Sequence, residues 1–182
     1  MSGPYSHHGN VNAVNKMSKV EFEMKKEHFK GPLRLTEYER NRLQEKTISQ
    51  SNSYMWMAER SKRLTASHFG KICKMKSSTP RVKTVISITY RSFQGNKATR
   101  YGLEKEPIAI EQLSKELGKC IIPAGIFVDK DMTWLAVTPD GLIDHDSIIE
   151  VKCHFAAVQL TLESAIRQNK IQFSLIQNGQ LR

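Results

Sequence analysis

The sequence has few cysteines, and they lie far apart. Cys73, Cys120 and Cys153 are the three cysteines in 182 residues, and none belongs to a Cys-x-x-Cys pair or to a Cys/His pattern with zinc-ligand spacing. The spacing argues against a disulfide framework and against a zinc site. We expect the three side chains to pack as small apolar groups in a reducing compartment.

Long apolar runs are missing as well. No stretch approaches the about 20 apolar residues that a transmembrane helix requires. The first residues, Met1 to His8, contain no apolar signal-peptide core. We therefore expect an intracellular protein, nuclear or cytoplasmic, that is neither secreted nor bound to a membrane.

Acidic residues are in the minority. The chain has 28 Lys and Arg against 18 Asp and Glu, which gives a formal charge of +10. A surface this positive favours polyanions such as nucleic acid, although a ribosomal-type or other basic protein has the same composition. With 39% hydrophobic residues, the length suits one domain with a real core and a polar tail.

The chain divides into three segments. Residues 1–32 are polar and lack a sustained apolar face, which predicts a mostly disordered lead-in with room for one short helix. Residues 33–53 form a predicted helical segment, since Thr36-Glu37-Tyr38-Glu39 has the form of a capping box and the helix would run to near Ser49. Residues 54–182 make up the main domain.

Helices dominate the first half of this domain and strands follow. Apolar spacing predicts helices at 54–62, 66–74, from Val82 to Gly95, at 98–117 with a kink or restart at Pro107, and at 161–169. The period becomes two at 120–129, 134–138 and 148–153, and a turn is predicted at Gln177-Asn178-Gly179. Short polar loops between the strands predict an antiparallel meander. The fold class is therefore α/β, with a small, mainly antiparallel sheet flanked by helices.

Two neighbouring stretches carry the chemistry: Thr138-Pro139-Asp140-Gly141 and Glu150-Val151-Lys152. Strand geometry would place Glu150 and Lys152 on one face, and the Asp-Gly turn region can bring Asp140 alongside. Such carboxylates suit a hard divalent cation, and an ammonium group can orient an attacking water. The pattern suggests metal-dependent phosphodiester hydrolysis; a turn aspartate and an exposed ion pair would look the same.

A longer ordered set of residues resembles the phage lambda exonuclease / YqaJ family of viral recombinases, within the PD-(D/E)XK nuclease superfamily. The residues in these motifs are most similar to those of the eukaryotic, often transposon-associated branch. The resemblance implies a restriction-endonuclease-like core and a ring-shaped homotrimer. The residues that carry it are Trp56, Arg60, Thr65-Ala66-Ser67, Gly102, Glu106, Ala109, Thr138-Pro139-Asp140-Gly141-Leu142, Glu150-Val151-Lys152-Cys153 and Phe155.

The resemblance assigns roles to individual residues. Asp140, Glu150 and the Val151 carbonyl would bind the metal, and Lys152 would position or activate the water. The family spacing selects Glu106, rather than Glu104, as the helix carboxylate that faces the site; a solvated surface glutamate is the alternative. The residues assigned to the 5'-phosphate are Arg60, Ser67 and Thr138. The alternatives are a surface charge for Arg60, a helix cap or first-turn residue for Ser67, and an ordinary strand residue for Thr138.

The chain departs from the family pattern in three places. Cys153-His154 stands where Cys-Pro is usual, and Val158 replaces a basic residue, which predicts a weaker grip on a 5'-phosphate. The family continues beyond residues 178–181 into a helix that packs on the sheet, so we expect a C-terminally truncated domain. Of the other candidates, His154 is expected at the surface, His68 in a structural or phosphate-proximal role, and Trp56 and Trp134 in the core.

The resemblance implies a Mg²⁺-dependent DNA exonuclease, with Mn²⁺ as a substitute. It would digest duplex ends in the 5' to 3' direction during recombination, repair or mobile-element processing. The first alternative is a family member that binds DNA without cleaving it. The second is a nonenzymatic basic interaction protein in which the Asp140, Glu150 and Lys152 pattern is accidental.

Overall fold

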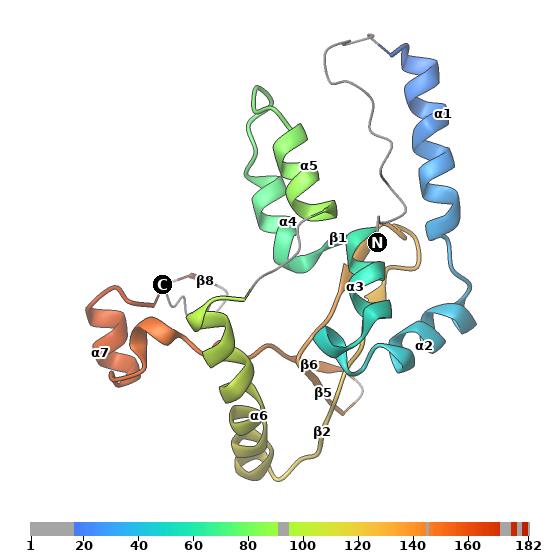
Figure 1. Cartoon of the computed structure of the whole chain (residues 1–182). Coiled ribbons are helices and arrows are strands. Elements are labelled where there is room, and N and C mark those ends of the chain that lie inside the picture. Colours follow the sequence, from blue (N-terminus) through green and yellow to red (C-terminus); the bar gives the residue numbers. More distant parts are fainter. Residues whose placement is uncertain (1–16, 91–94, 145, 172–175, 178–179, 182) are drawn as a thin grey trace.

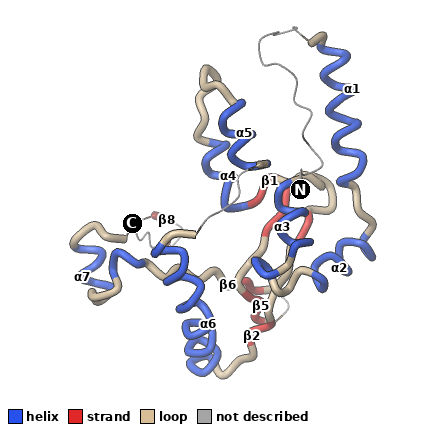
Figure 2. Tube along the Cα trace, viewed as in Figure 1, coloured by secondary structure: helices blue, strands red, loops and turns tan. Residues whose placement is uncertain are grey.

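The structure is a computed structural model, and it describes residues 17–90, 95–144, 146–171, 176–177 and 180–181. Its helices and strands are arranged as Figures 1 and 2 show. The α-helices are α1 (Lys19–Lys30), α2 (Glu37–Lys46), α3 (Tyr54–Ser61), α4 (Ala66–Cys73), α5 (Val82–Thr89), α6 (Lys97–Leu117) and α7 (Leu162–Arg167). Short 3-10 turns lie at η1 (Gly31–Leu33), η2 (Gln50–Asn52) and η3 (Phe155–Ala157).

The strands are short and form small sheets. The first sheet has the order β1 (Leu64–Thr65), β4 (Leu135–Val137), β3 (Phe127–Val128), with β1 parallel and β3 antiparallel to β4. The second is antiparallel, in the order β2 (Ile121–Ile122), β5 (Gly141–Ile143), β6 (Ser147–Ile149). Strands β7 (Ile176–Gln177) and β8 (Gln180–Leu181) form an antiparallel pair. The predicted α/β class, with mainly antiparallel strands and flanking helices, is confirmed.

The predicted strand boundaries were wrong in several places. The stretch 120–129 is two strands in different sheets, β2 and β3, separated by Pro123-Ala124-Gly125. The region after Asp140, predicted as a turn, is strand β5, and Leu64-Thr65 is the parallel strand β1. Strand β6 ends at Ile149, so Glu150-Val151-Lys152 follows the strand instead of forming it. Single-strand periodicity cannot detect such pairings, because each depends on a partner that is distant in sequence.

The predicted helices agree closely with the structure. The Thr36 side chain accepts from the Glu39 backbone N–H, which completes the predicted capping box of α2. Helix α6 ends at Gly118, whose φ of 62° is left-handed, and it continues through Pro107 without restarting. Helix α5 ends at Thr89, earlier than expected; residues 91–94 of that prediction, and 178–179 of the predicted turn, lie outside the described residues.

The described part of the lead-in contains one helix, for which the prediction had left room. Residues 19–30 form a regular helix, α1, capped by Ser18, whose side chain accepts from the Glu21 N–H at 3.1 Å. Ion pairs along the helix, such as Lys25 with Glu21 at 2.9 Å, stabilise it without an apolar face. Figure 1 shows α1 extending away from the sheets. The other part of the predicted lead-in, 1–16, lies outside the described residues.

The buried core lies where α2 packs on the first sheet. Ile126, Val128 and Ala136 form it, with Trp56 among the apolar side chains packed against them. The fully buried Thr47, just after α2, accepts a hydrogen bond from the Ile126 N–H at 2.9 Å. This contact fixes α2 to the sheet beside which the candidate site lies.

The cysteines are less buried than predicted. Cys73 and Cys120 are exposed, and only Cys153 is partly buried. Cys73 ends the projecting helix α4 and Cys120 follows the end of α6, so neither faces the core. The expectation that the cysteines pack as small apolar groups was wrong for Cys73 and Cys120.

Candidate active site

Arg60 of α3 draws together the residues predicted to bind a phosphate. Its Nη1 donates to Thr138 Oγ1 and its Nη2 donates to Ser67 Oγ, each at 3.3 Å. Thr138 follows β4 and Ser67 lies in the first turn of α4, so three separate elements meet at one guanidinium group. Desolvation lowers the pKa of Arg60, a group that stays charged at any physiological pH.

Trp56 contacts both Arg60 and Thr138, which the sequence did not predict. Its ring centroid lies 4.3 Å from the Arg60 guanidinium carbon, and its Nε1 donates to Thr138 Oγ1 at 3.2 Å. The i, i+4 spacing of Trp56 and Arg60 on one helix was a usable signal. Trp56 therefore packs against the core, as predicted, and also holds two of the polar residues in place. Trp134 is partly buried, with Lys30 Nζ 4.5 Å from its ring centroid.

Thr65 and His68 extend the cluster behind Ser67. The buried Thr65 Oγ1 lies 2.9 Å from Ser67 Oγ and 3.1 Å from His68 Nδ1. Burial lowers the pKa of His68, and the positive charges of Arg60 and Lys71 lower it further. The structure thus places His68 next to the predicted phosphate residues through one hydroxyl group.

Asp140, Glu106 and Glu150 form a second, acidic group. Asp140 Oδ2 accepts from the Val151 N–H at 2.5 Å, which ties the Asp-Gly region to the residues after β6. Burial raises the pKa of Asp140, and the charge of Glu150 adds to the effect. The pKa of Glu106 is raised by burial first, then by the charges of Asp140 and Glu150. The three carboxylates therefore lie near enough to affect one another's charge, Glu106 on α6, Asp140 just before β5 and Glu150 just after β6.

Lys152 lies beside this group. Its Nζ contacts Glu150 Oε1, so the two side chains share one side of the chain, as the two-residue spacing predicted. Both are exposed. In contrast, Glu104 is exposed on α6 while Glu106 is partly buried, which agrees with the choice of Glu106 by spacing. His154 is exposed, as predicted.

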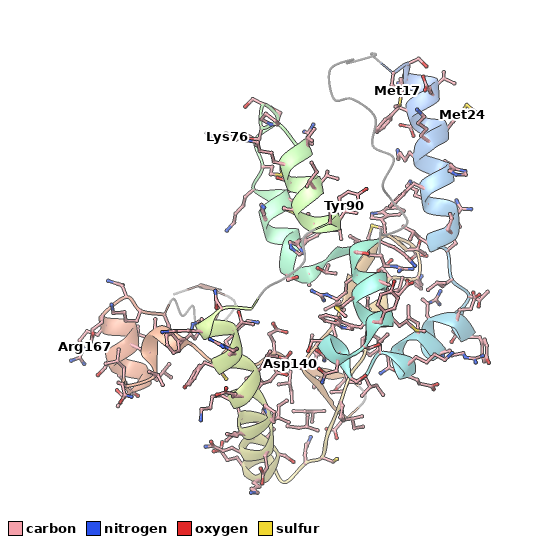
Figure 3. The ribbon with its side chains drawn as sticks, in the orientation of Figure 1. Met17, Met24, Lys76, Tyr90, Asp140 and Arg167 are labelled. Carbon is pink, nitrogen blue, oxygen red and sulfur yellow. The ribbon has the colours of Figure 1, made fainter. Side chains whose placement is uncertain are left out.

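A cleft borders Trp56 of the first group and the Glu106 and Asp140 carboxylates of the second, whereas Arg60 does not line it. It has a volume of about 640 Å³ and is lined by Trp56, Glu106 and Asp140, among other residues of α6 and of the segment before α3. Figure 3 shows Asp140 lying beside α6. Within the described part of the chain, no three His, Cys, Asp or Glu side chains converge closely enough to hold one metal ion. The described helices also include none that is long and apolar enough to span a bilayer.

Comparisons with known proteins identify the family. Residues 55–174 match the YqaJ-like viral recombinase domain, so the chain belongs to that family. The structure resembles the crystal structure of LHK-Exo in complex with dAMP, with 21% identity, a TM-score of 0.51, and coverage of 66% of this chain and 62% of that one. A second structure, an alkaline exonuclease (LHK-Exo) from Laribacter hongkongensis, gives 24% identity and a TM-score of 0.49, covering 65% and 59%.

The fold is therefore that of a lambda-exonuclease-like protein, as the sequence motifs predicted. The chain spans about three fifths of the length of these exonucleases. No curated protein matches it. Assignment to a eukaryotic branch stays a prediction.

Proposed function

We propose that the chain is a metal-dependent DNA exonuclease that hydrolyses phosphodiester bonds from duplex ends in the 5' to 3' direction. One observation carries the proposal: the run Thr138-Pro139-Asp140 joins a phosphate-type cluster to an acidic cluster. Thr138 contacts Arg60 at 3.3 Å, and Asp140 lines the same cleft as Glu106. A site that holds an end phosphate beside hydrolytic groups suits stepwise digestion from that end. Recombination, repair or mobile-element processing would be its setting.

The Arg60 cluster would bind the terminal phosphate. A guanidinium group can bind two phosphate oxygens at once, and the hydroxyl groups of Ser67 and Thr138 add directional hydrogen bonds. Trp56 packs under Arg60 and restricts its orientation. Because the guanidinium is already held by protein contacts, less side-chain entropy is lost when the phosphate binds.

The acidic cluster would hold Mg²⁺, with Mn²⁺ as a substitute. Its hard oxygen donors fit such an ion: the carboxylates of Asp140 and Glu150, the Val151 carbonyl, and Glu106 nearby. The raised pKa values of Asp140 and Glu106 reflect burial first and then repulsion by neighbouring carboxylates, which a divalent cation would relieve. When bound, the ion would act as a Lewis acid and lower the pKa of a bound water. Lys152 would orient that water and counter negative charge on the phosphate.

The decisive experiment is digestion of a linear, 5'-phosphorylated duplex by the full chain. With a duplex labelled at its 5' end, we expect labelled mononucleotides to be released in Mg²⁺ and none to be released in EDTA. Lys152→Ala should slow digestion by at least about 100-fold. Lys130→Ala, which removes an exposed lysine paired with Asp131 in the β3–β4 turn, should digest at the wild-type rate. Equal rates for Lys152→Ala and wild type would refute the assignment.

Binding without cleavage is the second candidate function. It is favoured by the contact between Lys152 and Glu150, and by the lack of a three-residue metal cluster among the described residues. A folded chain that binds duplex ends but releases no nucleotide with either Mg²⁺ or Mn²⁺ would support it. A ring-shaped homotrimer stays a proposal, which sedimentation of the purified chain would test.

A further inference from the structure

We propose that His68 and Thr65 are positioning residues, which set the direction of a hydrogen-bond chain that ends at Ser67 and so make recognition of an end phosphate dependent on a proton at His68. The inference rests on the proposed phosphate role of Arg60 and Ser67. It adds two residues to which the proposed function gives no role.

The chain of contacts is continuous. His68 Nδ1 lies 3.1 Å from Thr65 Oγ1, Thr65 Oγ1 lies 2.9 Å from Ser67 Oγ, and Ser67 Oγ accepts from Arg60 Nη2 at 3.3 Å. Each hydroxyl has a single proton to donate. Arg60 can only donate, so one end of the chain has a fixed direction, and His68 sets the direction at the other end.

The proposal includes the tautomer of the neutral ring: neutral His68 carries its proton on Nε2, and the hydrogen bonds then point from Ser67 through Thr65 to His68. Its Nδ1 then accepts from the Thr65 hydroxyl, and the Thr65 oxygen accepts from the Ser67 hydroxyl. Ser67 has no proton left for an incoming phosphate and presents only lone pairs to it. Thr65 is 3% exposed, so water has little access to supply a replacement partner.

A protonated His68 reverses the direction. Its Nδ1–H donates to Thr65, whose own proton then points to Ser67 Oγ. The Ser67 hydroxyl is released and can donate to a phosphate oxygen, alongside the guanidinium of Arg60. Hydrogen bonds to a charged acceptor are stronger than neutral ones, so this reversal should strengthen phosphate binding measurably.

The surroundings place His68 at the right point for such a switch. The charged groups that act on it are Arg60 of α3 and Lys71 of α4, and together with burial they lower its pKa, which favours the neutral ring near pH 7. Strands β1 and β4, which pack on α4, contribute no ionisable side chain. A bound phosphate would offset both positive charges, so phosphate binding and proton uptake favour each other. Preference for a phosphorylated end should therefore increase as pH falls.

The test compares duplexes with a 5'-phosphate and a 5'-hydroxyl by fluorescence anisotropy in EDTA, with the full chain. The quantity measured is the ratio of the two Kd values, hydroxyl over phosphate. In wild type we expect this ratio to rise about three- to tenfold from pH 7.5 to pH 6.0. In His68→Gln it should stay flat or fall, since only the second ionisation of the phosphate, with a pKa of about 6, still titrates.

Variants of Thr65 separate a relay from a merely structural role. Thr65→Val removes the hydroxyl but keeps the shape, and it should abolish the pH dependence while His68 still titrates in an NMR experiment. Thr65→Ser restores the hydroxyl and should restore the pH dependence. His154→Gln, at an exposed histidine outside the chain of contacts, is the matched control and should behave as wild type. If Thr65→Val does not fold, Thr65→Ser and His68→Gln still decide the question.

Two results would overturn the relay. One is an equal dependence of the Kd ratio on pH in wild type and His68→Gln. The other is a His68 titration midpoint that does not change when a 5'-phosphorylated oligonucleotide is added. If these occur while Arg60→Ala still abolishes the phosphate preference, the relay fails and the phosphate pocket survives. If wild type shows no phosphate preference at any pH, both proposals fail.

Discussion

At the scale of single residues, Arg63 is the side chain whose loss should cost most stability. It is buried, its Nε donates to the Thr133 carbonyl at 3.0 Å, and its Nη1 pairs with Glu59. Burial would raise the pKa of Glu59, but hydrogen bonds from Lys62 and Arg63 outweigh it and the pKa is lowered. Arg63→Ala should therefore lower the free energy of unfolding by about 3–5 kcal/mol, because it leaves a half-buried carboxylate without its buried partner.

Urea unfolding followed by circular dichroism measures this loss. Lys62→Ala is the matched control, since Lys62 also pairs with Glu59 at 2.6 Å but is exposed. Its cost should stay within about 1 kcal/mol. Because the pKa of Glu59 is lowered, its contribution is present above the unfolded pKa and disappears as pH falls through the folded value. An equal cost for the two variants would show that the burial of Arg63 contributes nothing.

Glu106 should behave in the opposite way in the absence of metal. Its pKa is raised in the folded state, so the folded protein binds more protons and loses stability as pH rises above the unfolded value. Glu106→Gln should therefore raise the free energy of unfolding at pH 7–8 in EDTA. Thermal unfolding at several pH values measures this, with Glu104→Gln, at an exposed residue of the same helix, as control.

Adding Mg²⁺ should reverse the order of stability, so that wild type has a higher free energy of unfolding than Glu106→Gln. At a hundred times its Kd the ion would stabilise wild type by about 2.7 kcal/mol, and Glu106→Gln should gain less. A wild-type unfolding temperature that ignores Mg²⁺ would contradict a metal site at these carboxylates.

The residue scale also shows what the sequence can and cannot predict. Glu150 and Lys152 contact each other, as predicted, but they follow strand β6, so the strand geometry on which that prediction rested does not extend to them. The hydrogen bond from the Val151 N–H to Asp140 spans 11 residues and depends on the pairing of β5 with β6. The contact of His68 with Thr65 was missed because the sequence carries no sign of which hydroxyl a histidine ring will meet.

At the scale of elements, capping residues were better guides than periodicity alone. Thr36 and Gly118 marked helix ends correctly because cap chemistry is local. The strands have two or three residues each, too few for a period-two signal to separate β2 from β3. Their placement depends on distant partners, such as the docking of α2 against Gly125.

Gly125 gives a prediction at this scale. A Cβ there would come 1.9 Å from the Gln44 carbonyl oxygen, so α2 would have to move. Gln50, just after α2, donates to the Ala124 carbonyl at 3.0 Å and to the Pro139 carbonyl at 3.1 Å, next to Thr138 and Asp140. Gly125→Ala should therefore destabilise the fold by about 1–3 kcal/mol and weaken the preference for a 5'-phosphate.

Gly102→Ala is the matched control for Gly125→Ala. Gly102 lies inside α6, and nothing is within 4 Å of the position of its Cβ. The change should stabilise the fold by roughly 0.5–1 kcal/mol through helix propensity. Thermal unfolding of both variants tests the contrast. A stable Gly125→Ala variant with an unchanged phosphate preference would show that α2 does not position the site.

At the scale of the whole molecule, several positively charged side chains lie on two helices that project from the sheets. Helices α4 and α5 bury none of their residues, and Figure 1 shows the pair projecting from the sheets. Figure 3 places Lys76 at the tip of this projection. The formal charge of +10 predicted a polyanionic partner but could not place the contact, because composition carries no position. The fold puts Lys71, Lys74, Lys76, Arg81 and Lys83 on or beside these two helices.

A double variant tests the contribution of this positive charge to DNA binding separately from that of the phosphate site. Lys74 and Lys76 form no ion pair in the part of the chain that the structure describes, whereas Lys25 and Lys26 of α1 are paired with Glu21 and Glu23. If α4 and α5 contact duplex phosphates, Lys74→Gln with Lys76→Gln should reduce the slope of log K against log salt by up to about 2. The ratio of Kd values for hydroxyl and phosphorylated ends should stay unchanged.

The matched control, Lys25→Gln with Lys26→Gln, removes the same charge from α1 and should leave the slope near wild type. Arg60→Ala should give the converse result, a lost end preference with a slope smaller by about 1. Anisotropy titrations between 50 and 200 mM salt measure both quantities. If the α1 variant changes the slope as much as the α4–α5 variant, the positive charge acts through the whole molecule and the projecting helices have no special part in holding DNA.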